Sequence, residues 1–417
     1  MSILSASSPS TSLLFRHRPF RLLFTTRTTA NTANQMQAVA VGWLIYDITG
    51  SALALGLIGL VQFIPPLALS LIAGHVVDRY SRKHILVCCY IVEFSVSAAL
   101  LVLALFADRP VRLIFGLLLI NAIARTFEAP ALQSLVPSTV PREILMRAVS
   151  AHASAGKMSQ LIGPALGGLL YGFGAGVDFG LCAALILAAG VASLLLPVPA
   201  AAGQPRKVTW NTLVAGIRFI WHEPAVLGAM SLDLAATLFG GVVALLPIFA
   251  RDILDINSWG FGLLRAAPAT GALIVAAILT RITINRSGGH IMFGAVAVYG
   301  VATAAFGLSG HAGLSLIMLM IVGGADMLST VIRQSLIQFA TPDDMRGRVF
   351  AVNALFVNTS SQIGMFESGV TADWFGAMGS AVLGGVAVLA IVAIWAWRFP
   401  TLRNVQRPDR LVAMQSH

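Results

Sequence analysis

The sequence predicts an all-α membrane protein with twelve transmembrane helices, arranged as two parallel six-helix pseudo-repeats around a central cavity. Three observations predict this fold class. Of the 417 residues, 57% are hydrophobic and only 11% are charged, whereas a soluble domain has about 25% charged residues. The apolar residues gather in twelve windows, each long enough to cross a hydrocarbon core of about 30 Å as a helix. The two halves of the chain also repeat one another.

The twelve windows, in chain order, predict helices at residues 22–46, 52–73, 84–107, 112–135, 145–171, 177–197, 224–249, 259–282, 289–308, 312–338, 348–372 and 376–397. An even number of spans places both termini on one side. Of the 27 cations, 19 fall in the tails and loops on that side, and the other side has Arg109, Arg112 and Arg251. By the positive-inside rule both termini are cytoplasmic.

The expected organisation has five parts: a cytoplasmic tail (1–21), an N-terminal bundle (22–197), a cytoplasmic loop (198–223), a C-terminal bundle (224–397) and a cytoplasmic tail (398–417). No cleaved signal peptide is expected, because no apolar core with a small-residue cleavage site follows Arg16 and Arg18. In the loop, Trp210 to Trp221 fits a short amphipathic helix with Leu213, Ile217 and Ile220 on one side. A plain linker is the alternative.

The composition argues against several classes of function. The net charge of +10 is what cytoplasmic loops beside an anionic leaflet produce, and no basic segment is interleaved with aromatic residues, so no nucleic-acid partner is expected. Cys88, Cys89 and Cys182 lack the spacing of disulfides or metal ligands. No phosphate-binding loop, histidine cluster or nucleophile elbow occurs. We therefore expect no metal, no cofactor and no enzyme activity.

The internal repeat appears when the sequence is shifted by 201 residues. The shift aligns Gln133-Ser134-Leu135 with Gln334-Ser335-Leu336, Pro141 with Pro342, Arg147 with Arg348, Gly163 with Gly364, and Gly168 with Gly369. A match over some 36 residues at one offset exceeds what shared hydrophobicity alone produces. Because each half has six helices, the copies have the same orientation and are related by an axis along the membrane normal. Such halves leave a cleft on that axis.

Several motifs resemble those of the major facilitator superfamily. The loop motif between its second and third helices, Gly-x-x-x-Asp-Arg-x-x-Arg-Lys, is matched by Gly74, Asp78, Arg79, Arg82 and Lys83. Gly156 and the run Gly163-Pro164-Ala165-Leu166-Gly167-Gly168 resemble the fifth-helix motif of its exporters, and Arg125 resembles its intramembrane arginine. Segments 261–268 and 341–349 resemble its branch of drug and siderophore exporters. In the second half, two departures stand out: only Arg281 and Arg286 of the loop motif remain, and Met365 replaces the proline.

The resemblance implies a secondary active transporter that works by alternating access, in the plasma membrane of a bacterium (its inner membrane), and we expect a monomer. Its expected partners are a small-molecule substrate, protons and the lipid bilayer. The first, fourth, seventh and tenth helices would surround the cavity. By the same resemblance, Asp78 would meet the positive N-terminal end of the eleventh helix and form a cytoplasmic gate, with Gly74 permitting the close approach. A purely topogenic basic loop is the alternative.

Charged residues inside the predicted spans are the candidates for the transport site, because each costs about 2.5–3.5 kcal/mol at mid-bilayer unless it faces a cavity or a partner. They are Arg27, Glu93, Arg125, Glu128, Lys157, Asp233, Arg265, Asp326, Arg333 and Glu367. Helical spacing groups them with neutral polar residues into a stripe on each of four helices. We expect a substrate cavity lined by Arg27, Asn31, Asn34, Gln35, Asn121, Arg125, Lys157, Thr237, Thr330 and Arg333.

For proton coupling we expect a carboxylate that burial and a nearby cation can tune. Asp326 is the first candidate, since it lies roughly 20 Å from the cytoplasmic end of its helix. Asp233 and Glu128 come second. The alternative is a permanent ion pair, of Arg125 with Glu128 or Asp326.

The remaining intramembrane charges have open roles. Glu93 would snorkel or pair, and Glu367 lies near the outer end of its helix. Lys157 would attract an anionic substrate or neutralise Asp326. For Arg265, near the outer end of its helix, an ion pair at an outer gate is the alternative to a role in transport.

A bend in the fifth helix is expected at Gly163, Pro164, Gly167 and Gly168. Proline removes a backbone donor, and glycine permits close helix contact. Simple packing is the alternative. Together these features predict a proton-coupled exporter of small amphipathic compounds, drug-like or siderophore-like. An uptake permease of the same fold is the alternative, and a non-transporting receptor or scaffold is a third possibility that the four polar stripes disfavour.

Overall fold

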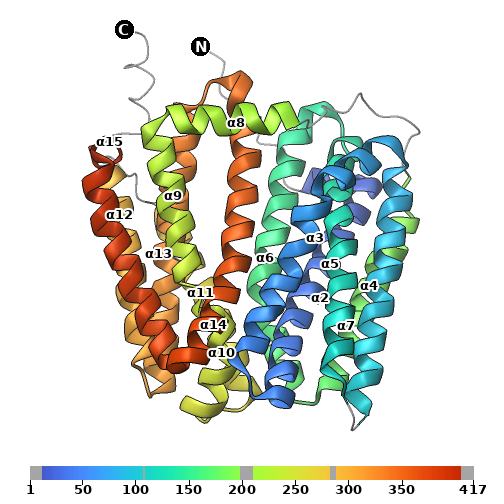
Figure 1. Ribbon diagram of the computed structural model, residues 1–417. Helices are drawn as coiled ribbons and strands as arrows, with labels where there is room; N and C mark the ends of the chain where they lie inside the picture. The colour runs from blue at the N-terminus through green and yellow to red at the C-terminus, as the bar shows by residue number, and fades with distance from the viewer. Residues whose placement is uncertain (1–11, 107–108, 198–209, 282–287, 405–417) are drawn as a thin grey trace. The chain divides into compact units, whose positions relative to one another are not determined.

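A computed structural model describes residues 12–106, 109–197, 210–281 and 288–404, and helices are the only regular secondary structure of these residues (Figure 1). The long helices are α2 (Arg18–Thr49), α3 (Ala52–Arg79), α4 (Arg82–Leu105), α5 (Val111–Leu135), α6 (Leu145–Tyr171), α7 (Ala175–Leu194), α9 (Pro224–Phe239), α11 (Ser258–Leu279), α12 (Gly288–Gly307), α13 (Ala312–Ala340) and α14 (Asp343–Arg398). The short ones are α1 (Ser12–Arg16), α8 (Trp210–His222), α10 (Leu246–Ile248), α15 (Pro400–Arg403), the 3₁₀ turns η1 (Val136–Ser138), η2 (Arg142–Ile144) and η3 (Val242–Leu245), and the π-helical η4 (Phe249–Ile253).

Each predicted window overlaps a helix, but not every helix is apolar enough to count as a span. Within the described part of the chain, nine stretches are both long and apolar enough to cross a membrane. α2 and α6 fall outside this set because polar residues interrupt their apolar windows. α14 covers the last two predicted windows, which Gly376 separates with a non-helical conformation at φ 75°. The number of twelve spans therefore stays a prediction.

The seventh predicted helix is not continuous, which corrects the expectation for 224–249. α9 ends at Phe239, and η3, α10 and η4 carry the chain on to Ile253. Gly240 and Gly241 lie at the break and have no room for a side chain: a Cβ on Gly241 would approach the carbonyl oxygen of Gly364 to 2.6 Å. The break exposes backbone groups in the middle of an otherwise apolar segment.

The chain divides into two compact units. Unit 1 contains residues 1–38, 65–167 and 173–206, and unit 2 contains residues 39–64, 168–172 and 207–417. In unit 1, α4 packs against both α5 and α7; in unit 2, α13 packs against α11 and α12, and α14 against α9 and α12 (Figure 1). α2, α3 and α6 each contribute residues to both units. The expected division into two bundles joined by the 198–223 loop remains a prediction.

The segment 210–221 is a helix, α8, which lies across the ends of α9 and α14 (Figure 1). Ile220 is 4% exposed and packs in a cluster with Val226, Ile337 and Val349. Ile217 is 41% exposed, and a role of α8 as an amphipathic helix along the inner surface stays a prediction. The side chain of Leu213 lies outside the described residues.

Candidate functional site

Unit 2 contains a buried ion pair between two of the predicted intramembrane charges. The Arg333 Nη1 atom on α13 lies 2.5 Å from Asp233 Oδ2 on α9, and the side chains are 4% and 6% exposed. Arg333 also donates to Asn353 Oδ1 on α14 and to Thr330 Oγ1, each at 3.3 Å. One guanidinium therefore links three helices. Buried charges require this kind of pairing and hydrogen bonding, because desolvation is otherwise too costly.

A small cavity adjoins the ion pair. It is lined by Asp233, Ala236, Thr237, Val296, Tyr299, Ala325, Asp326 and Ser329, and its volume of about 10 Å³ is close to what one water molecule needs. Two carboxyl groups, from α9 and α13, therefore border one polar cavity beside a single guanidinium. Asp233 interacts electrostatically with both Arg333 and Asp326, so the three charges are coupled.

The break in α9 is one turn from this cavity. Tyr299 Oη on α12 donates a hydrogen bond of 2.9 Å to the carbonyl oxygen of Gly240, which also accepts from the backbone N–H of Val242 at 2.8 Å in place of a regular helical bond. A Cβ on Gly240 would collide with the Tyr299 ring and hydroxyl. In other transporters, interrupted helices at mid-membrane place backbone dipoles at ligand sites. In this protein the interruption at Gly240 lies one turn after Thr237.

Unit 1 contains a second buried polar cluster. Asn34 Nδ2 on α2 donates to Glu93 Oε2 on α4 at 3.1 Å, and Tyr90 Oη donates to Glu128 Oε1 on α5 at 2.9 Å. Glu93 is 0% exposed and Glu128 8%, so the expectation that Glu93 snorkels is wrong. No ion pair joins Arg125 to Glu128 among the residues that the structure describes. The tyrosine hydroxyl takes that place because α4 brings it directly to the carboxylate.

The polar residues of α2 have two sets of partners in unit 1. Asn31 Nδ2 donates to the carbonyl oxygen of Gly156 on α6 at 3.0 Å, and the Arg27 guanidinium occupies the space that a Cβ on Gly156 would need. Asn34 turns instead to α4. Asn31 and Asn34 thus bond to different helices, although their spacing of three places them on one face of α2.

The glycines of α6 make close helix contacts. A Cβ on Gly163 would lie 2.5 Å from Gln35 Cβ, and one on Gly167 would lie 2.8 Å from Met36 Cα, both on α2 in unit 1. Within unit 2, Gly168 packs on Gly262 of α11. α6 continues through Pro164 as one helix. The packing role of these residues is therefore visible, whereas a bending role stays a prediction.

Two cations of the loop motif bind helix C-termini within unit 1. Arg82 Nη1 donates to the carbonyl oxygen of Ser134 at 3.1 Å, and Lys83 Nζ donates to that of Leu196 at 2.9 Å. These carbonyls end α5 and follow α7, where cations are favoured by the helix dipole. Asp78 and Arg79 are exposed. A Cβ on Gly74 would meet no other atom of unit 1 within 4 Å.

Two further candidates have partners other than those expected. Arg265 Nη1 donates to the carbonyl oxygen of Val243 at 2.9 Å, so the alternative of an outer-gate ion pair is wrong for this residue in the described chain. Lys157 is exposed and its Nζ donates to Gln160 Oε1 at 3.3 Å. Asn121 is 8% exposed on the face of α5 that also bears Arg125.

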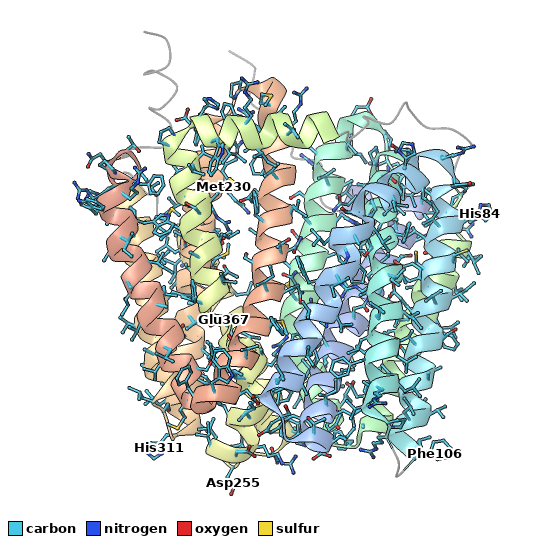
Figure 2. The ribbon with its side chains drawn as sticks, viewed as in Figure 1. His84, Phe106, Met230, Asp255, His311 and Glu367 are labelled. Carbon is cyan, nitrogen blue, oxygen red and sulfur yellow. The ribbon has the colours of Figure 1, made fainter. Side chains whose placement is uncertain are left out.

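Sequence reasoning missed Tyr90, Tyr299 and Asn353, because the search began from charged residues. A signal existed for Tyr90, which precedes Glu93 by three residues and so shares its face of the helix. For Tyr299 and Asn353 no such signal exists, since no charged residue lies three or four positions from either of them. In Figure 2, Glu367 is labelled on α14; its carboxyl accepts a long 3.5 Å contact from Ser368 Oγ.

Comparison with known proteins points to one family. The sequence profile described as transmembrane secretion effector matches residues 9–413. Macrolide efflux protein A of Streptococcus pyogenes is 24% identical over 384 residues, which cover 89% of this chain and 92% of the relative. The enterobactin exporter EntS of Escherichia coli O81 (strain ED1a) is 28% identical over 384 residues, covering 91% of this chain and 87% of the relative.

Solved structures agree on the fold. A bacterial homologue of the human lysosomal transporter Spinster matches with a TM-score of 0.71 at 13% identity, covering 98% of this chain and 99% of its own. The nucleoside transporter NupG matches with a TM-score of 0.67 at 14% identity, covering 93% and 99%. The chain belongs to the transmembrane secretion effector family, in the exporter branch of the major facilitator superfamily, and it is a multi-pass membrane transporter, not an enzyme.

Proposed function

We propose that this protein is a proton-coupled exporter of small amphipathic compounds that works by alternating access. The observation that carries the proposal is a water-sized cavity beside the break in α9, which Asp233 and Asp326 both line, with Arg333 paired to Asp233. Transport coupled to a proton requires a buried group whose protonation changes its interactions with the rest of the protein. This cluster has two carboxyl groups and one guanidinium, so a single proton changes which groups attract one another.

The proposed cycle follows from this charge balance. With both carboxylates ionised, Arg333 is shared between Asp233 and Asp326; with Asp326 protonated, Arg333 is held by Asp233 alone. The two arrangements bind α9, α13 and α14 differently, which is the differential interaction that an alternating cycle needs. Each proton that moves down a potential of 100 mV supplies about 2.3 kcal/mol. Glu128 in unit 1 is a further coupling candidate.

The architecture that we propose has twelve spans in two parallel six-helix repeats, as a monomer in a bacterial plasma membrane with both termini in the cytoplasm. The internal repeat supports it, and so does an equivalence seen separately in each unit. Gly163 packs on Thr32 and Gln35 of α2, and its counterpart Gly364 packs on Thr237 and Leu238 of α9. In each repeat, the fifth helix therefore meets the first through the same glycine.

Three groups of residues have proposed roles in the cycle. The polar residues of the first, fourth, seventh and tenth spans contact the substrate, together with Lys157. The loop motif from Gly74 to Lys83 forms the cytoplasmic gate. The run from Gly163 to Gly168 permits the bend that the cycle needs.

Export of an amphipathic compound is the proposed direction and substrate class because the relatives named above are a macrolide efflux protein and an enterobactin exporter. Both names describe outward transport of a small molecule. The identities of 24% and 28% leave the individual substrate open.

A counterflow assay in proteoliposomes under an imposed pH gradient tests the proposal. Purified protein is reconstituted, and the movement of a radiolabelled macrolide and of enterobactin is followed with the gradient in each direction and after its collapse. We expect gradient-dependent exchange that Asp326→Asn abolishes. Accumulation only in the opposite direction would establish an uptake permease, and binding without counterflow would establish a receptor.

A further inference from the structure

Glu93 is a completely buried carboxyl group of unit 1. It lies on α4, it is 0% exposed, and its Oε2 atom accepts one hydrogen bond, from Asn34 Nδ2 on α2 at 3.1 Å. No Lys, Arg or His lies within 4 Å of it among the described residues, since the ion pairs there join Arg251 to Asp47 and Arg333 to Asp233. A buried carboxylate with one neutral hydrogen bond and no ion pair is strongly disfavoured.

The two hydrogen-bonded side chains leave two oxygen atoms without partners. Glu93 Oε1 and Asn34 Oδ1 are both buried, and neither has a hydrogen-bond partner in the described chain. Both atoms are acceptors when the carboxyl is ionised, so they cannot satisfy one another. A proton on Glu93 Oε1 supplies the missing donor. The acid and the amide can then exchange two hydrogen bonds, one in each direction, and both oxygens are satisfied.

The charges that face Glu93 also indicate one proton on the carboxyl groups of this cluster. From α5 it interacts electrostatically with Glu128 and Arg125. α4 itself adds the neutral side chains of Cys89 and Tyr90, and the hydroxyl of Tyr90 donates to Glu128. One guanidinium thus faces two carboxyl groups, so one of the two carboxyls balances it and the other is left in excess.

The other two helices around Glu93 add no cation. α2 presents Asn34 and Gln37, and Gln37 Oε1 accepts a 2.6 Å hydrogen bond from Ser97. α7 adds Cys182 and Asp178, which contact one another at 3.8 Å from Sγ to Oδ2. Asp178 is itself an acid and is 0% exposed. Neither set of side chains supplies a cation to Glu93.

We propose that Glu93 is a proton-binding site of unit 1, carrying its proton on Oε1 as an acid–amide pair with Asn34. The site is separate from the Asp233, Arg333 and Asp326 cluster of unit 2. Because the acid–amide pair joins α4 to α2, loss of the proton would break one of its two hydrogen bonds and leave a carboxylate facing an amide oxygen. A role of this proton in the transport cycle rests on the proposed function, whereas its presence on Glu93 does not.

Infrared spectroscopy of the purified, lipid-reconstituted protein tests the proposal directly. A protonated buried carboxyl has a C=O stretch that is distinct from the bands of a carboxylate and that shifts in heavy water. We expect such a band at neutral pH in the wild type, its loss in Glu93→Gln, and its retention in Asp326→Asn. A Glu93→Gln spectrum that equals the wild type would overturn the proposal, and so would a band that is lost in Asp326→Asn and kept in Glu93→Gln.

Stability supplies a second readout that does not depend on transport. A glutamine side chain has the shape of a protonated glutamate and can donate to Asn34 Oδ1 with its own amide. We therefore expect Glu93→Gln to unfold within a few degrees of the wild type, and Glu93→Ala and Asn34→Leu to unfold well below it. If Glu93→Gln is as unstable as Glu93→Ala, the native protein needs the ionised form and the proposal fails. Absence of counterflow in the wild type, with the infrared band present, would count against the proposed function and not against this site.

Discussion

Arg333 Nη1 and Asp233 Oδ2 lie 2.5 Å apart, with both side chains almost completely buried. The pair links α13 to α9, and Asn353 extends it to α14. In a low-dielectric interior, such a pair gives little net stability compared with apolar residues of the same volume, but losing one partner leaves an uncompensated charge. The pair is therefore sensitive to single substitutions at either end.

Asp233→Ala should destabilise the protein by about 3–5 kcal/mol, because Arg333 would be left buried and unpaired. The measurement is the free energy of unfolding of the purified protein in detergent. The double variant Asp233→Leu with Arg333→Met should recover part of the loss.

The matched control is Asp47→Ala at the exposed pair with Arg251, whose side chains are each 46% exposed. This change should cost no more than about 1 kcal/mol. If Asp233→Ala and Asp47→Ala lower the free energy of unfolding by the same amount, the buried pair is no more sensitive to substitution than the exposed one.

Asp326→Asn should abolish transport driven by a pH gradient while leaving folding intact, because an amide cannot take up or release the proton. The rate of counterflow without a gradient should lose its dependence on pH. Asp255→Asn is the control, since Asp255 is exposed and its left-handed conformation, with φ of 48°, suits asparagine. Unaltered gradient-driven transport in Asp326→Asn would remove this residue from the coupling mechanism.

The Asp47 and Arg251 pair joins α2 to η4 within unit 2, next to a hydrogen bond from Tyr46 Oη to Asp252. We expect these two contacts to hold the end of α2 against η4. Reversing either charge, by Asp47→Arg or Arg251→Asp, should place like charges together, separate the two segments and raise the rate at which a thiol reagent labels a cysteine buried beneath the pair. The double reversal should restore the native rate. If the double variant labels as fast as the single variants, the pair does not hold the two segments together.

Asp78→Asn should insert normally but slow the transport cycle, if the loop motif is a gate as well as a topological signal. Topology is checked by labelling single cysteines from each side, and cycling by counterflow. Lys83→Met is the comparison variant: it removes the donor to the Leu196 carbonyl and should lower stability by about 1 kcal/mol, with a smaller effect on rate. Full activity of Asp78→Asn would leave the loop with a topological role only.

Gly240→Ala should disrupt the break in α9, because the new methyl group would collide with Tyr299. We expect transport to fall at least tenfold, with the Tyr299 hydrogen bond lost. Gly294→Ala on α12 is a matched control, since a Cβ there meets no atom within 4 Å and alanine favours a helix over glycine by about 1 kcal/mol. Equal activity of the two variants would show that the break has no role in transport.

Much of the fold was predictable because a membrane span needs about 20 consecutive apolar residues, and such a run is visible in the sequence itself. The windows located the long helices, and the repeat of Gly163 and Gly364 pointed to equivalent helix contacts. The break at Gly240 and Gly241 was not predictable. Two glycines in an apolar run fit close packing as well as an interruption, and a tyrosine on another helix decides between them.

The sequence by itself determined which residues are costly to bury, and it named Asp233, Asp326 and Arg333 because charge and hydropathy are properties of single residues. Only the tertiary structure decided their partners. Arg333 pairs with Asp233, 100 positions away along the chain, whereas Glu128, only three positions from Arg125, accepts from Tyr90. Partner choice depends on which faces of different helices meet. That is set by the packing of the whole unit, and local spacing carries no information about it.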